Sequence, residues 1–134
     1  MLIGLLNYIM SCSVPVSIGE LCDKYTILQI KAERITDVGK LVKVNNELEL
    51  LGPFVEQFSV SQELLTNLKE INERLWDIED SIRKKESLKQ FDNEFIEIAR
   101  TVYVTNDARF RAKTEINERY NSHVCEVKSY AEYL

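Results

Sequence analysis

Residues that interrupt helices are scarce in this chain, which has four glycines and two prolines among 134 residues. Because glycine and proline mark most turns, their scarcity favours long helices over a fold of many short strands. A chain of this length suits a single domain. Its core can bury about two thirds of the unfolded surface without help from a metal or a disulfide.

Residues that commonly bind metals or act as nucleophiles are also few. His123 is the only histidine, which argues against histidine-based zinc sites and nucleophiles. The cysteines, Cys12, Cys22 and Cys125, are odd in number and match no metal-binding spacing, so we expect reduced thiols in a cytoplasmic protein. The chain has no Gly-x-Ser-x-Gly, phosphate-binding loop, Cys-x-x-Cys or His-Glu-x-x-His motif.

The net charge of −5 excludes an overall basic surface for nucleic acid. No apolar run approaches the roughly 18–20 residues that cross a membrane, so we expect neither a nucleic-acid nor a membrane partner. Residues 1–13 begin with a short apolar stretch. This segment is either an arm that packs on the domain or an extension upstream of a natural start at Met10.

Apolar residues recur three and four positions apart through most of the chain, which is the spacing of helices that bury one face. Ser17 followed by Glu20 is a capping-box pattern, and it predicts that the first helix begins there. Asp37 can cap a second helix, and Gly52-Pro53 predicts where that helix ends.

Two longer helices are expected at about residues 61–86 and 92–120. The first of them carries an apolar seam that steps by four and three: Leu64, Leu68, Ile71, Leu75, Ile78 and Ile82. The pattern predicts an all-α antiparallel helical bundle with a long hairpin, in one domain over residues 14–120. A second copy can bury such a seam, so we also expect a homodimer. Residues 121–134 are either a helical tail or loose chain.

Polar residues interrupt the apolar stripe of the last helix, where the spacing directs Asn106, Arg109 and Lys113 toward the core. We expect them to meet Glu79 and Asp80 across the hairpin, because buried charges must pair, reach water or bind a ligand. The candidate ligand-binding residues are Lys24, Lys31, Arg83, Asn106, Arg109 and Lys113. The supporting acidic and polar residues are Glu79, Asp80, Tyr103 and Asp107.

Three segments, "VPVSIGELCDKYTILQIKAERI" (14–35), "LWDIEDSIR" (75–83) and "ARTVYVTNDARFRAKTEIN" (99–117), resemble an uncharacterised family of small helical domains from bacteria and phages. The resemblance implies no activity, because none is assigned to that family. It does imply a set of polar positions, which fall here on Glu20, Asp23, Lys24, Thr26, Lys31, Glu79, Asp80, Arg83, Tyr103, Asn106, Asp107, Arg109, Lys113 and Asn117.

The residues leave several functions open, and they do not decide whether the protein is an enzyme. The first function is binding of a small phosphate- or carboxylate-bearing metabolite, clamped by Arg83 and Arg109, with Asp80 or Asp107 as a general base or Mg²⁺ ligand. The second is a helical interaction or assembly module whose charges form a structural ion-pair network.

A third function is a Mg²⁺-dependent nucleotide pyrophosphatase. Acidic residues are available for it, although their spacing is not the one expected: Glu47, Glu49, Asp77 and Asp80. Asp77 and Asp80 share a helix face and could hold Mg²⁺ with help from a phosphate. Apart from that, we expect no metal site and no cofactor.

Overall fold

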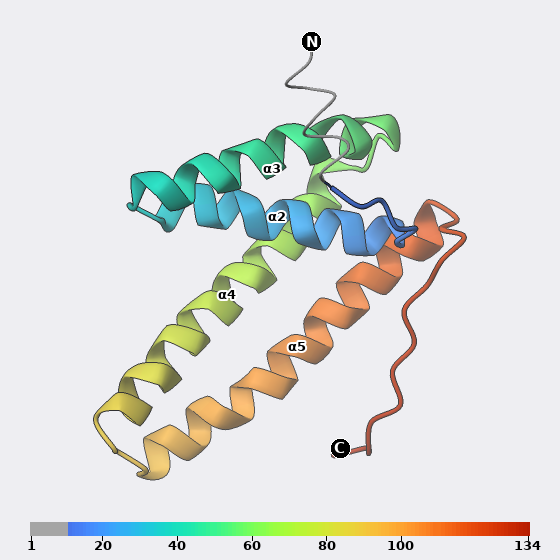
Figure 1. Cartoon of the computed structure of the whole chain (residues 1–134). Helices are drawn as coiled ribbons and strands as arrows, with labels where there is room; N and C mark the ends of the chain where they lie inside the picture. Colours follow the sequence, from blue (N-terminus) through green and yellow to red (C-terminus); the bar gives the residue numbers. More distant parts are fainter. Residues whose placement is uncertain (1–10) are drawn as a thin grey trace.

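The computed structural model describes residues 11–134, which form the helices α2 (Ile18–Arg34), α3 (Val38–Gln57), α4 (Gln62–Ser87) and α5 (Asn93–Arg119). No strand occurs within that range. Figure 1 shows α4 and α5 as a long antiparallel hairpin, with α2 and α3 lying across one end of it. The predicted all-α fold with a long hairpin is therefore confirmed. Most of the predicted apolar arm, residues 1–10, lies outside the described residues.

Each helix begins at a side chain that accepts a hydrogen bond from a free backbone N–H of the first turn. This is the usual role of Ser and Asp at a helix N-cap. The four caps are Ser17 to Glu20 N at 3.0 Å, Asp37 to Lys40 N at 2.8 Å, Ser61 to Leu64 N at 3.2 Å and Asp92 to Phe95 N at 2.9 Å. The predicted starts of all four helices are confirmed.

The predicted end of the second helix is wrong, because α3 continues through Pro53 to Gln57. A proline inside a helix removes one backbone hydrogen bond and crowds the carbonyl four residues earlier. Here Pro53 and Glu49 are both exposed, so the carbonyl that loses its partner can bond to water. Two residues further on, Val55 is buried, and its packing favours continuing the helix past the proline.

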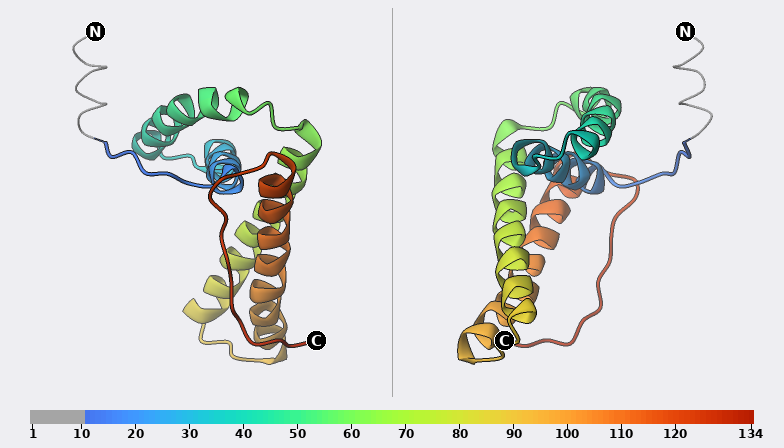
Figure 2. Two further views of the ribbon diagram at one scale, coloured as in Figure 1. Left: turned by 90° about the vertical axis from the view of Figure 1, so that its right-hand side faces the viewer. Right: turned by 60° about the vertical axis from the view of Figure 1, so that its left-hand side comes forward.

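The helices form three layers, with α3 outermost, α2 in the middle and the hairpin beneath (Figure 2). Among the described helices, α3 contacts only α2, whereas α2 also contacts α4 and α5. The main core forms where α2 crosses the hairpin. It consists of the buried residues Ile18, Cys22, Leu64, Leu68, Ile71, Ala112 and Ile116.

The apolar seam of α4 is only partly covered. Leu64, Leu68 and Ile71 lie beneath α2 and are buried, whereas Ile78 and Ile82 are half-buried. The reason is visible in Figure 1, because the hairpin extends well beyond the layer formed by α2 and α3. The far half of the hairpin therefore has a face that no other helix of the described chain covers.

Residues 121–134 form no helix. The chain turns back after α5 and runs alongside the hairpin to the C-terminus (Figures 1 and 2). The sequence left a helical tail and loose chain as alternatives for this segment, and the structure shows no helix there. No helix within residues 11–134 combines the length and the apolar character needed to span a bilayer.

Candidate functional site

The inward polar residues are organised around Asp23, whose side chain is only 1% exposed at the contact between α2 and α5. Arg109 of α5 donates to both of its carboxylate oxygens, through Nε to Oδ1 at 2.8 Å and through Nη2 to Oδ2. These hydrogen bonds to Asp23 raise the pKa of Arg109 above its usual value. The two-point contact fixes both the charge and the plane of the guanidinium.

Asp23 receives a third hydrogen bond from α4. Asn72 Nδ2 donates to Asp23 Oδ1 at 3.0 Å and also lies 3.1 Å from Thr26 Oγ1. Thr26 donates its own hydroxyl proton to the backbone carbonyl of Asp23 at 3.0 Å. All three helices that meet in the core therefore contribute to holding one buried carboxylate, which would otherwise be costly to desolvate.

Lys113 lies one turn further along α5, with a side chain only 8% exposed. Its ammonium pairs with Glu20 at 2.6 Å and with Glu126 of the C-terminal tail at 2.8 Å, and it lies 4.0 Å from Asp23. Burial by itself lowers the pKa of Lys113, but the hydrogen bonds to Glu126 and Glu20 outweigh it and leave the pKa raised. The same contact with Lys113, helped by Lys128, lowers the pKa of Glu126 to about 2.

The close approach of α2 to α5 depends on a glycine. Gly19 donates its backbone N–H to Asn117 Oδ1 at 2.6 Å. A Cβ at position 19 would lie 2.5 Å from the backbone oxygen of Lys113, closer than side-chain carbons come in real structures. Gly19 and Asn117 thus fix the helix crossing that brings Asp23 within reach of Arg109.

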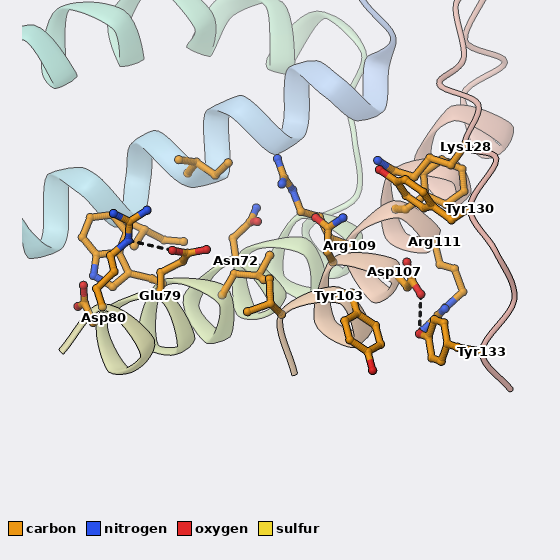
Figure 3. Close-up of a pocket in the computed structure, with 18 of the residues that line it drawn as sticks. Asn72, Glu79, Asp80, Tyr103, Asp107, Arg109, Arg111, Lys128, Tyr130 and Tyr133 are labelled. Carbon is orange, nitrogen blue, oxygen red and sulfur yellow. Dashed lines mark hydrogen bonds and ion pairs between the residues drawn. The ribbon is translucent and has the colours of Figure 1, made fainter. Parts of the chain in front are cut away.

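Next to this network an open groove of about 890 Å³ runs along the uncovered face of the hairpin. We call it the hairpin groove. One side is α4, with Leu75, Trp76 and Arg83, and the other is α5, with Tyr103 and Arg109. Residues of α2 close its upper end, and the C-terminal tail adds a third wall (Figure 3).

The structure brings seven of the predicted site residues to the hairpin groove and leaves three elsewhere. Those lining it are Glu79, Asp80, Arg83, Tyr103, Asn106, Asp107 and Arg109. Lys24 is exposed and pairs with Glu47 at 2.7 Å, away from the groove. Lys31 is half-buried and forms no ion pair within the described residues, and Lys113 is enclosed by its carboxylate partners.

The expected pairing across the hairpin is wrong. Arg109 and Lys113 bind the carboxylates of α2 and the tail, whereas Glu79 pairs with Arg83 of its own helix at 3.0 Å. The reason is the position of α2. It crosses the hairpin at the level of Arg109 and Lys113, so its carboxylates lie nearer to them than Glu79 does.

The candidate site residues from the sequence did not include Asp23, Asn72, Asn117 or Glu126, although the family resemblance placed Asp23 and Asn117 among its polar positions. The sequence contains a pattern that points to Asp23. Gly19, Asp23 and Thr26 follow helical spacing and form a second inward face of α2. Glu126 belongs to a segment without periodicity, so no pattern in the sequence connects it to Lys113.

The acidic residues considered for Mg²⁺ do not gather at one place. Asp77 pairs with Arg34 at 2.6 Å and Glu47 pairs with Lys24. Among residues 11–134 no group of three or more His, Cys, Asp or Glu side chains could hold a metal ion.

Comparison with known proteins gives a family without a function. No curated protein matches the chain, and no solved structure matches it. Residues 12–134 match a family described as "Family of unknown function (DUF6165)". This match covers the whole hairpin, the crossing helix α2 and the tail, and the chain belongs to that family.

Proposed function

We propose that this domain binds a small anionic ligand that carries a flat ring, in the hairpin groove. The observation that carries the proposal is the state of Arg109, which lines the groove with its guanidinium already held by Asp23. Asp23 accepts from Nε and Nη2, and Nη1 donates no hydrogen bond within the described residues. An arginine oriented in this way loses little conformational freedom when it binds a phosphate or carboxylate.

Asn106 supplies a second polar group without a partner. It is half-buried, lines the groove one turn from Arg109, and its side-chain amide forms no hydrogen bond within residues 11–134. An amide both donates and accepts, so it can orient a ligand that Arg109 holds by charge. Arg111 also lines the groove and adds positive charge, as does Arg83, which pairs with Glu79.

The size and the walls of the groove suit a ring-bearing metabolite. Its volume of about 890 Å³ lies within the range of roughly 300–1,000 Å³ typical of small-molecule sites. Trp76, Tyr103 and Phe110 supply aromatic surface along its length. Of the carboxylates that line it, Asp80 and Asp107 are the candidates for a general base if the bound ligand reacts, and Asp107 already accepts a hydrogen bond from Tyr133.

The proposal is tested by thermal shift with phosphate, dicarboxylates and adenosine monophosphate, each with and without Mg²⁺. A ligand at about 100 times its dissociation constant adds roughly 2.7 kcal/mol to the free energy of unfolding, which raises the melting temperature by several degrees. Asn106→Ala and Arg83→Ala should reduce that shift while leaving the Asp23 network intact. Lys24→Ala, on an exposed ion pair outside the groove, is the matched control.

The test has a clear negative result. If none of these compounds raises the melting temperature, the hairpin groove is not a site for this class of ligand. A shift of equal size in wild type, Asn106→Ala and Arg83→Ala would place the binding site outside the groove and would also contradict the proposal.

A specific observation favours assembly as a second candidate function. The large apolar residues that α3 exposes follow a four-residue spacing that Asn46 interrupts once: Val38, Val42, Leu50, Phe54 and the C-cap Phe58. Rows with this spacing form the ridges through which helices pack. We propose a second copy of the chain as the partner, and sedimentation of wild type and Leu50→Lys is the test. A monomer at all concentrations would exclude a homodimer.

A further inference from the structure

The C-terminal tail retraces α5 in the opposite direction. Glu126 contacts Lys113, the Lys128 ammonium lies 5.6 Å from the ring centre of Phe110, and the Tyr133 hydroxyl donates to Asp107 Oδ2 at 2.5 Å. The Tyr133 ring also packs edge-on against Tyr103, with ring centres 5.0 Å apart. Later residues of the tail thus contact earlier residues of α5, so the tail and the helix run antiparallel.

Side chains alone hold this segment. Towards the C-terminus, the last backbone–backbone hydrogen bond runs from Ser122 N to Asn117 O, at 2.8 Å. Within the described chain, no residue after Ser122 takes part in such a bond. Val127 and Tyr130 are 86% and 70% exposed, so the segment buries little apolar surface. A stretch with few buried contacts and no backbone hydrogen bonds opens at low free-energy cost, without unfolding of the core.

The contacts differ along the tail. At its start, Glu126 reaches the enclosed ammonium of Lys113, whose side chain is 8% exposed. At its end, Tyr133 makes its hydrogen bond at the surface, where its own exposure is 49%. Because water competes for the outer contact much more than for the inner one, the outer contact should break first.

The tail also forms a wall of the hairpin groove, through Lys128, Tyr130 and Tyr133 (Figure 3). We infer that residues 127–134 act as a strap on the groove: the strap swings out on the Glu126–Lys113 contact to admit a ligand and closes over it through Tyr133 and Asp107. This inference rests on the proposed ligand-binding function for the purpose of the strap, but the movement itself can be measured without a ligand.

The chain provides its own probe for this movement. Trp76 is the only tryptophan and lines the groove on the α4 side, opposite the tail. A Ser129→Cys variant, with Cys12 and Cys125 changed to Ser, can carry an acceptor dye for resonance energy transfer from Trp76. Cys22 can stay in place because it is fully buried and its thiol does not compete for the dye.

Tyr133→Phe is the decisive variant, because it removes only the hydroxyl that binds Asp107. Losing a hydrogen bond to a charged acceptor should raise the open fraction of the strap several-fold, and energy transfer from Trp76 should fall. Tyr130→Phe is the matched control, since no hydrogen bond of the Tyr130 hydroxyl occurs within residues 11–134, and its transfer should equal that of wild type. Adenosine monophosphate, used as the probe ligand, should restore transfer in Tyr133→Phe.

Each result decides a separate question. Equal energy transfer in wild type, Tyr133→Phe and Tyr130→Phe would overturn the strap, whether or not a ligand binds. A fall in transfer that adenosine monophosphate does not reverse, although this probe raises the melting temperature, would also overturn it, because the tail would then move independently of the site. A fall in transfer with no thermal shift from any compound would uphold the movement and contradict the proposed function.

Discussion

Asp23 and Arg109 are 86 residues apart in the chain, and the arginine donates hydrogen bonds to both oxygens of the buried carboxylate. This one pair joins α2 to α5. It also places a charge-oriented guanidinium at the edge of the hairpin groove. The fold and the candidate site therefore depend on the same contact.

Arg109→Ala should lower the free energy of unfolding by about 3 kcal/mol or more, because it leaves the Asp23 carboxylate buried without its cation. Denaturation by urea measures the loss. The double variant Asp23→Ala with Arg109→Ala should be more stable than Arg109→Ala alone, since no unpaired charge is then buried. If the two changes were simply additive, the residues would not be energetically coupled.

Gly19→Ala should destabilise the protein by about 1–3 kcal/mol, because the added Cβ would meet the backbone of α5 at Lys113. Gly52→Ala is the control, since outside its chain neighbours and its own helix backbone nothing lies within 4 Å of a Cβ at that helical position. The higher helix propensity of alanine favours that change, but the ring of Pro53 opposes a Cβ on the residue before it, so the net effect on stability should be small. Thermal unfolding should therefore show a large loss of stability for Gly19→Ala and a much smaller change for Gly52→Ala. A neutral Gly19→Ala would mean that the α2–α5 crossing is looser than the structure indicates.

Acid should weaken the anchor of the tail over a defined pH range. The pKa of Glu126 falls from 4.5 to about 2 in the folded protein, chiefly through its hydrogen bond to Lys113. A lowered pKa means that the stabilisation is fully present above about pH 4.5 and is lost as the pH falls toward about 2. The stability of wild type should therefore approach that of Glu126→Gln across this range. A constant difference between the two proteins would show that the carboxylate is not held by Lys113 in solution.

Cys22 should resist alkylation while the protein is folded. Burial, and to a lesser extent the charge of Asp23, raises the pKa of its thiol to about 12, and the thiolate is the reactive form. Cys12 and Cys125 are exposed and should react with iodoacetamide first. Mass spectrometry of the labelled peptides gives the order, and denaturant should remove the difference. Rapid labelling of Cys22 in native buffer would contradict its position in the core.

Local chemistry was sufficient to predict the helices. Ser17, Asp37, Ser61 and Asp92 satisfy the N–H groups of the turns that follow them, and that interaction spans only three residues. The same locality explains the error at Pro53. A proline does weaken a helix in isolation, but the burial of Val55 two residues later is a tertiary effect, and the sequence around the proline does not contain it.

The sequence by itself determined that this is an all-α protein with a long hairpin, and that Asn106, Arg109 and Lys113 lie on the inner side of its last helix. Helical periodicity is a property of the chain and specifies which residues share a face. Only the tertiary structure decided what those residues meet. The crossing of α2, set by Gly19 and Asn117, brings Asp23 into contact with Arg109. The non-periodic tail places Glu126 against Lys113. Such long-range pairings depend on how the helices pack rather than on where they begin.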